Sequence, residues 1–196
     1  MALDKNGDKE QTAKVKSPIS LAHVVFRTAN FACMIDFWRT FLGAEVTHKD
    51  DSIAFLRYDF EHHRIAIIAI PDLGPKVPKT AGLDHVSFSY ETLHDLAETY
   101  LQRKSLGINP TWCINHGPTT SMYYKDPDGN TIETQVDNYE SPEEANQFMT
   151  SKLFAENPIG TDFDPDEFVE RLRAGEDENK IKTRVEIGPR GLPPNF

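Results

Sequence analysis

The sequence has no long hydrophobic run, so none of its segments can cross a membrane as a helix. No stretch approaches the roughly 18 apolar residues that a membrane-spanning helix needs. The opening segment, MALDKNGDKEQTAKVKSP, contains no apolar core of the kind found in secretory signals. We therefore expect a cytoplasmic protein with no membrane partner.

Positive charge and cysteine are also scarce. The chain carries 21 Lys and Arg against 31 Asp and Glu, a net charge of −10. Nucleic-acid binding requires a basic surface, so nucleic acid is excluded as a partner. The two cysteines, Cys33 and Cys113, lie in segments with a buried pattern. Without an export signal we expect free thiols rather than a disulfide.

The 196 residues, 38% of them hydrophobic, suffice for one globular domain with a substantial core. Residues 1–17 are polar and aperiodic, and they are expected to form a flexible N-terminal arm. We expect a two-module domain at 18–139, with modules at about 18–72 and 82–138. Residues 140–196 then form C-terminal helices and an extended tail.

The central region repeats one order of elements. The first copy has a strand pattern (LAHVVF), a helical pattern that ends at LG, and the strand sequence FLRYD. The second copy has LDHVSF, a helical pattern that also ends at LG, and MYYKD, in the same order. The period is near 62 residues, the distance from His23 to His85. Two copies of so long a repeat indicate a duplicated βαβββ module, because a solenoid would need more copies.

The C-terminal region has two helical patterns of its own. SPEEANQFMTSKLFAEN starts with a capping arrangement and predicts one helix. DPDEFVERLRAG predicts another, with Asp164 as N-cap and a stop at Gly175. Neither segment carries residues in a pattern that indicates chemistry.

Three potential metal ligands stand out in the repeated core. His23 and His85 occupy the same place in the first strand of each module, and Glu133 lies on the last strand of the second. Two histidines and one carboxylate on three strands can bind one face of an ion and leave positions open. That ligand set suits Fe(II), and Zn(II) or Mn(II) are the alternatives.

The paired modules resemble the vicinal-oxygen-chelate superfamily, which includes glyoxalases, antibiotic-resistance transferases, epimerases and type I extradiol ring-cleavage dioxygenases. The segment INHGPTTSMYYKDPDGNTIET matches the extradiol signature in residue type and spacing. The matching positions are Ile114, His116, Met122, Tyr123, Asp126, Pro127, Gly129 and Glu133. The resemblance covers residues 19–137 and implies an α+β fold. In it, two tandem βαβββ modules form a curved mixed sheet around a metal site, with extra C-terminal helices.

The resemblance also assigns roles in Fe(II)-dependent extradiol cleavage of a catechol-type ring with O2. His23, His85 and Glu133 would hold the iron. His116 and Tyr123 would be catalytic groups that donate hydrogen bonds to substrate and oxygen. The turn DPDG has a structural role, because it sets the strand register that points Glu133 inward.

One departure from the family pattern concerns proton transfer. Members commonly carry an acid–base histidine shortly before the second metal ligand, whereas IPDLGPKVPKTAGLD, residues 70–84, contains none. His62 and His63 precede this segment on a strand, where neighbouring side chains face opposite ways. We take His63 as the inward-facing candidate for this catalytic role.

Three other functions compete with ring cleavage. Metal-dependent isomerases and lyases of the superfamily, such as glyoxalases, need a fourth ligand, and superposing the modules puts Ala66 there. A thiol transferase needs three ligands but leaves His116 and Tyr123 unexplained. A non-catalytic protein that binds a small aromatic ligand would not need the ligand set. The expected partners are a small aromatic diol and O2, with a possible homodimer.

Overall fold

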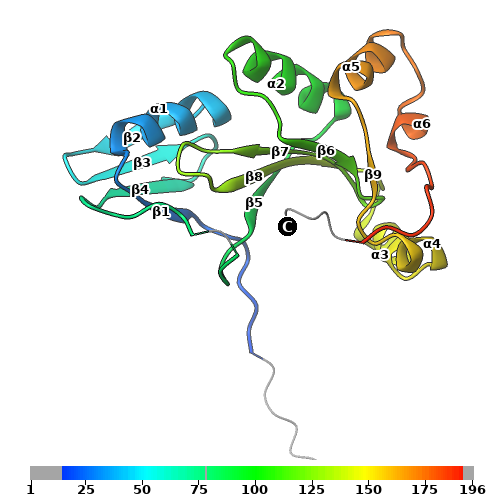
Figure 1. Ribbon diagram of the computed structural model, residues 1–196, viewed down its shortest axis with the longest axis horizontal. Helices are drawn as coiled ribbons and strands as arrows, with labels where there is room; N and C mark the ends of the chain where they lie inside the picture. Colours follow the sequence, from blue (N-terminus) through cyan, green and yellow to red (C-terminus); the bar gives the residue numbers. More distant parts are fainter. Residues whose placement is uncertain (1–14, 78, 192–196) are drawn as a thin grey trace, which may run out of the picture.

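The computed structural model describes residues 15–77 and 79–191, and its elements follow the duplicated order (Figure 1). The first module contains β1 (Val24–Thr28), α1 (Phe31–Leu42), β2 (Glu45–Lys49), β3 (Ile53–Arg57) and β4 (Ile65–Ala69). The second contains β5 (His85–Ser89), α2 (Leu93–Ser105), β6 (Trp112–Asn115), β7 (Thr119–Lys125) and β8 (Thr131–Asp137). The predicted α+β class and both βαβββ modules are confirmed.

Hydrogen bonding divides the strands into two mixed sheets. The first sheet has the order β1-β4-β3-β2, and the second has β5-β8-β7-β6 with the short strand β9 (Thr161–Asp162) added beyond β6. The first strand of each module lies at a sheet edge and runs parallel to the last strand of that module. The two sheets therefore repeat one topology, and only the second is extended by the C-terminal region.

The strand registers show that the modules are equivalent residue by residue. Ser87, two positions after His85, pairs with Glu133 on β8. In the first module, the residue two positions after His23 pairs with Ala66 on β4. Ala66 therefore occupies the place that Glu133 has in the second module, as the superposed sequences predict.

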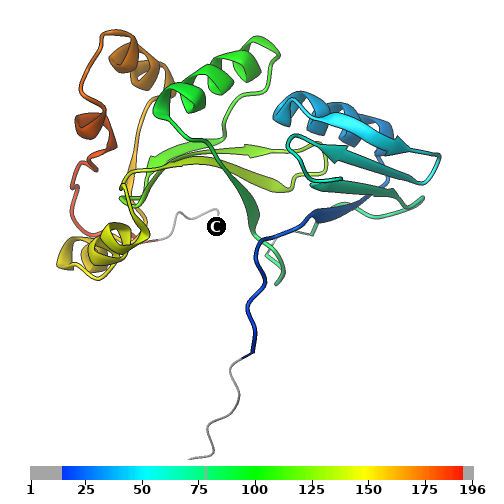
Figure 2. The same ribbon diagram turned by 180° about the vertical axis from the view of Figure 1, so that it is seen from behind.

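Both modules place their helix on the same side of the sheets (Figures 1 and 2). The inward face of α1 carries residues at helical spacing, and Trp38 and Phe41 contact the second module. The Trp38 ring lies 6.0 Å from Phe88 of β5, and the Phe41 ring lies 5.1 Å from Tyr124 of β7. One core thus serves both modules, and the sheet faces turned away from the helices remain available for a site.

A buried arginine strengthens this junction. Arg103, near the end of α2, donates two hydrogen bonds to the Phe41 carbonyl, of 3.1 Å from Nε and 2.7 Å from Nη2. Nη2 also donates to the Tyr90 hydroxyl at 2.7 Å. The guanidinium carbon lies 3.9 Å from the centre of the Phe41 ring. Arg103 therefore ties α2 to the end of α1 by both hydrogen bonds and stacking.

The C-terminal region contains α3 (Pro142–Met149), α4 (Lys152–Glu156), α5 (Pro165–Arg173) and α6 (Glu178–Lys182). The prediction of one helix across the first two is wrong. Ser151 interrupts it, because its hydroxyl caps a new helix by accepting the Phe154 N–H at 3.2 Å. The predicted cap of α5 is confirmed, since Asp164 accepts the N–H groups of Asp166 and Glu167.

Residues 1–14, most of the predicted N-terminal arm, and residues 192–196 of the predicted tail lie outside the described residues. None of the helices in 15–77 and 79–191 is long and apolar enough to cross a membrane.

Both cysteines are free thiols. Cys113 is buried as expected, but the expectation is wrong for Cys33, which α1 presents to solvent. The predicted domain limits at residues 17 and 139 and the predicted homodimer stay predictions.

We expect Arg103→Ala to lower the free energy of unfolding by about 2–3 kcal/mol, because the Phe41 carbonyl and the Tyr90 hydroxyl lose a charged donor in a buried place. Urea unfolding measures this loss. Arg39→Ala is the matched control on α1, since Arg39 is exposed and lies 3.8 Å from Asp36, which is also exposed. It should change the free energy by less than about 0.5 kcal/mol. Equal losses in the two variants would contradict the role given to Arg103.

Candidate active site

Four of the predicted site residues form one hydrogen-bonded chain on the open face of the second sheet. Tyr123 on β7 lies directly opposite Glu133 on β8, and its hydroxyl is 2.9 Å from Glu133 Oε1. Glu133 Oε2 lies 3.1 Å from His85 Nε2, at the start of β5. On the other side of the tyrosine, His116 Nε2 lies 2.9 Å from the same hydroxyl. The structure thus brings His85, His116, Tyr123 and Glu133 together.

The turn between β7 and β8 fixes this arrangement. The Asp126 carboxylate accepts the backbone N–H groups of Asp128 at 3.0 Å and Asn130 at 2.8 Å. Gly129 takes a left-handed φ of 80°, which a glycine adopts without strain. Side chains alternate along a strand, so a slip of one residue would turn Glu133 into the helix-packed core. The turn has the structural role predicted for it.

Glu133 and His85 form an ion pair. Burial raises the pKa of Glu133, but hydrogen bonds from His85, Ser121, Ser87 and Tyr123 outweigh burial and hold that pKa at about 2. The hydrogen bond to Glu133 is the main cause that raises the pKa of His85 to about 9, against the opposing effect of burial. Without a metal, the pair therefore holds a carboxylate and an imidazolium at neutral pH.

Tyr123 and His116 keep their ordinary neutral forms. Burial, followed by the charge of Glu133, raises the pKa of Tyr123 well above its usual value. Burial is also the main cause that lowers the pKa of His116. At neutral pH the chain thus contains a protonated phenol and a neutral imidazole beside a carboxylate.

The other two predicted residues form a separate pair on the first module. The rings of His23 and His63 lie 4.4 Å apart, and the His63 ring stacks on Phe55 at 4.6 Å. His63 is buried, and burial lowers its pKa. It precedes β4 (Ile65–Ala69) and does not lie on the strand that the sequence predicts for it. Within 15–77 and 79–191, no group of three His, Cys, Asp or Glu side chains is placed to hold a metal. The structure therefore does not bring His23 to His85 and Glu133.

The donors of the second module suit a metal ion. Two ligand atoms at roughly 2.1 Å from an ion and at right angles to one another lie about 3 Å apart. His85 Nε2 and Glu133 Oε2 are separated by 3.1 Å. The other nitrogen of His85, Nδ1, lies 2.7 Å from a carboxylate oxygen of Asp84. A carboxylate behind a histidine ligand is the usual arrangement that orients the ring. His85 and Glu133 therefore fit as two ligands of a metal.

Sequence reasoning missed several residues around this chain. Asp84 could have been found, because a carboxylate next to a candidate histidine ligand is a signal in itself. Trp112 stacks on Tyr123 with ring centres 5.0 Å apart, and its position opposite Tyr123 follows only from the β6–β7 register. The backbone carbonyl of Ile159 accepts a hydrogen bond from His116 Nδ1. No side-chain pattern could have indicated that contact.

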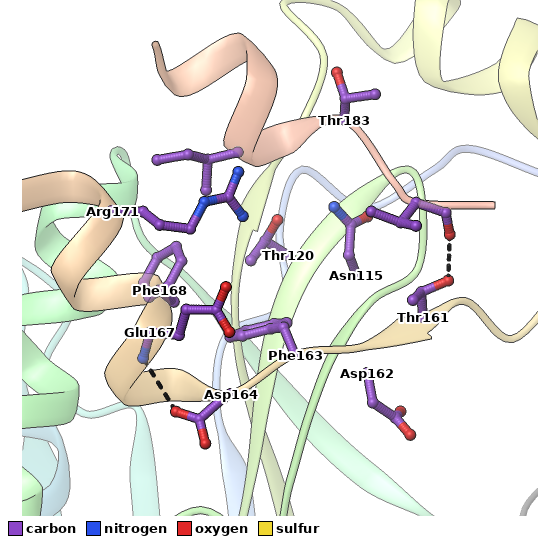
Figure 3. Close-up of a pocket in the computed structure, with 12 residues that line it drawn as sticks. Asn115, Thr120, Thr161, Asp162, Phe163, Asp164, Glu167, Phe168, Arg171 and Thr183 are labelled. Atoms are coloured by element: carbon purple, nitrogen blue, oxygen red, sulfur yellow. Dashed lines mark hydrogen bonds between the residues drawn. The ribbon is translucent and has the colours of Figure 1, made fainter. Parts of the chain in front are cut away.

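A cavity of about 240 Å³ lies between α5, α6 and the β6–β9 edge (Figure 3). Its lining is mixed, with polar groups such as Arg171 and Thr120 beside the apolar Phe163, Phe168 and Ile181. None of the six predicted site residues lines it. Thr120 lies three residues before Tyr123 on β7, so the two side chains face opposite sides of the sheet, and the cavity lies on the side away from the hydrogen-bonded chain.

Sequence comparisons place the chain among known proteins. The model of the Glyoxalase/Bleomycin resistance protein/Dioxygenase superfamily matches residues 20–134. Over 165 residues the chain is 42% identical to biphenyl-2,3-diol 1,2-dioxygenase 2 of Rhodococcus globerulus, covering 84% of this chain and 87% of that protein. It is 40% identical over 167 residues to biphenyl-2,3-diol 1,2-dioxygenase 3 of the same organism, covering 84% and 88%.

Solved structures share the fold at lower identity. A glyoxylase/bleomycin resistance protein/dioxygenase domain from Frankia sp. EAN1pec matches with a TM-score of 0.52 at 18% identity, covering 62% of this chain and 99% of that chain. Lactoylglutathione lyase from Agrobacterium tumefaciens matches with a TM-score of 0.50, also at 18% identity, covering 62% and 96%. These matches cover less than two thirds of this chain and bear on the fold alone.

The pKa of His85 generates a prediction for the metal-free protein. A pKa raised from 6.5 to about 9 on folding stabilises the folded chain fully below about pH 6.5, and that stabilisation is lost as the pH rises through 9. We expect the free energy of unfolding, measured with urea in the presence of a chelator, to fall between pH 7 and pH 10. His85→Gln should remove most of this fall. An unchanged pH dependence in His85→Gln would contradict the ion pair.

Proposed function

The chain belongs to the Glyoxalase/Bleomycin resistance protein/Dioxygenase superfamily, and from that premise we propose that it is an extradiol ring-cleavage dioxygenase. It breaks the ring bond between one hydroxyl-bearing carbon of a catechol-type substrate and the adjacent carbon that bears no hydroxyl. Both atoms of O2 enter the product. Relatives at 40–42% identity are named as biphenyl-2,3-diol 1,2-dioxygenases. The structural observation that carries the proposal is the chain from His116 through Tyr123 and Glu133 to His85.

We assign the metal to Fe(II), with Mn(II) and Zn(II) as weaker candidates. His85 and Glu133 would hold it from the second module. His23, at the equivalent place in the first module, would complete a set of two histidines and one carboxylate, although the structure does not place it beside the other two. The bound metal would supply a Lewis-acidic, redox-active centre for the reaction of the diol with O2. Asp84 orients His85 by accepting the hydrogen bond of Nδ1.

Tyr123 and His116 act on the charge that develops beside the carboxylate. The Tyr123 hydroxyl stays protonated in its buried place, so it can donate a hydrogen bond to negative charge on oxygen. His116 is neutral and its Nε2 lies at that hydroxyl, where it can take a proton and return it. Trp112 stacks on Tyr123 and forms an aromatic wall suited to a flat ring.

His63 is the candidate for proton transfer on the first module. It is a buried imidazole whose ring lies against His23, and its lowered pKa keeps it neutral and able to accept a proton. We assign it the acid–base role for which residues 70–84 provide no histidine.

The register argues against the four-ligand isomerases and lyases of the superfamily. The position equivalent to Glu133 in the first module is Ala66, which has no donor atom. A protein that only binds an aromatic ligand would have no use for the ionised, hydrogen-bonded Glu133, which is costly to bury. The proposed substrate is therefore an aromatic diol, cleaved with O2.

Oxygen uptake with a panel of catechols, including biphenyl-2,3-diol, tests the proposed function. The protein is purified without oxygen, its metal content is measured, and each metal is reloaded separately. We expect Fe(II)-dependent oxygen consumption and a ring-opened product that absorbs in the near-visible range. If the Fe(II) form consumes no oxygen with any catechol while Zn(II) supports an isomerisation, the proposed function is wrong.

Glu133→Ala should abolish metal retention, because it removes a ligand and leaves His85 with only the Asp84 carboxylate as its charged partner. Glu170→Ala, which removes an exposed glutamate from α5, is the control and should keep the metal. Metal content after gel filtration gives the readout. Equal metal content in wild type and Glu133→Ala would refute the ligand assignment.

Tyr123→Phe should retain the metal and lower kcat by about 10²-fold, since it removes one hydrogen-bond donor to developing charge. The neighbouring Tyr124→Phe is a matched control. Tyr124 faces the helix-packed core, where its hydroxyl contacts the Met122 sulfur at 3.7 Å and interacts with Arg103. Similar rates in both variants would remove Tyr123 from the proposed machinery.

A further inference from the structure

A turn in the C-terminal region reaches back to the active site. Residues 157–160 follow α4 and lie outside the segment that the superfamily model matches. Within this turn the Ile159 carbonyl accepts a hydrogen bond from Nδ1 of His116. The main chain of the turn passes so close to β6 that a Cβ on Gly160 would lie 2.3 Å from the Asn115 carbonyl oxygen.

The contact with Ile159 decides where the proton of His116 sits. A backbone carbonyl can only accept a hydrogen bond, so Nδ1 must carry the proton. Burial lowers the pKa of His116, and a neutral ring carries one proton in all. Nε2 is then unprotonated and faces the Tyr123 hydroxyl 2.9 Å away. That hydroxyl has one proton, which it can donate either to Nε2 or to Glu133 Oε1, also 2.9 Å away.

Asn157 holds the turn in the conformation that makes this contact. Its side chain is fully buried. The side-chain oxygen accepts the N–H groups of Ile159 at 3.2 Å and Gly160 at 2.8 Å, and the side-chain nitrogen donates to the Gly160 carbonyl at 3.0 Å. Every polar group of this amide thus acts on the two residues at the end of the turn.

Arg184 fastens the turn and the histidine to each other. Its Nη1 donates to the Asn157 carbonyl at 2.7 Å and to the His116 carbonyl at 3.2 Å. Glu186 balances the charge through contacts of 3.0 Å and 2.9 Å. A buried arginine that joins both backbones keeps the distance from Ile159 to His116 fixed.

We propose that the turn at residues 157–160 is a positioning element of the active site, in which Asn157 keeps His116 as the Nδ1–H tautomer and presents its bare Nε2 to Tyr123. The catalytic importance of this tautomer rests on the proposed function, but the tautomer itself does not. The C-terminal region then positions a residue of the active site, in addition to packing against the domain.

Nitrogen NMR of histidine-labelled, metal-free protein tests the tautomer directly. We expect His116, identified by the signal missing in His116→Gln, to show a protonated Nδ1 and an unprotonated Nε2. Asn157→Ala should shift the signals toward a mixture of tautomers. Asp164→Ala is the matched control, because it removes two backbone hydrogen bonds of the same region at the start of α5. That variant should leave the His116 signals unchanged.

Kinetics of the metal-loaded variants provide the second readout. We expect Asn157→Ala to lower kcat by roughly 10-fold to 10²-fold with little change in KM, since misplacement of a catalytic group has effects of that order. Asn157→Asp, which keeps the accepting oxygen for Ile159 and Gly160, should restore part of the rate and the tautomer. If Asn157→Ala does not fold, Asn157→Asp provides the tautomer and rate measurements in its place.

Two results would overturn the proposal. One is an Nδ1–H signal unchanged in Asn157→Ala, and the other is the same tautomer shift in Asp164→Ala. Failure of the proposed function looks different. In that case the wild type shows the Nδ1–H tautomer and responds to Asn157→Ala as expected, yet it consumes no oxygen with any catechol.

Discussion

The buried carboxylate of Glu133 is the constraint on which the rest of the site depends. An ionised carboxylate in an apolar surrounding is costly unless charge and hydrogen bonds compensate it. Glu133 is only 5% exposed, and the neighbouring strands supply His85, Tyr123 and two serines around it. Its hydrogen bond in turn raises the pKa of His85, and its charge adds to the burial that raises the pKa of Tyr123. The carboxylate thus contributes to the protonation state of the two groups that it contacts.

Much of the fold and part of the site follow from the sequence by simple rules. The repeat predicts two βαβββ modules, the turn residues predict the β7–β8 register, and that register points Tyr123 and Glu133 to one face. These features are local, or they are copied from one module to the other. Because side chains alternate along a strand, the register set at the turn also predicts which face the side chains several residues away point to.

Other features could not be predicted, because they depend on contacts between distant segments or on the backbone. The division into two sheets depends on which strand edges pair, and period-two patterns do not specify partners. The break at Ser151 depends on a hydroxyl that caps one helix in preference to continuing another. The contact from His116 to Ile159 involves a carbonyl, which every residue has, so the sequence gives no signal for it. The position of His23 relative to His85 and Glu133 depends on how the two modules pack together, which neither module encodes alone.

The shared core on the helix side has a consequence for how the duplicated halves behave. Phe41 of the first module packs on Tyr124 of the second, and Arg103 of the second is bound to the carbonyl of Phe41. A single module cut from the chain would expose these rings and leave the arginine without its acceptor. The two copies, although equivalent in topology, therefore form one cooperative folding unit, and neither can diverge at this junction without a matching change in the other.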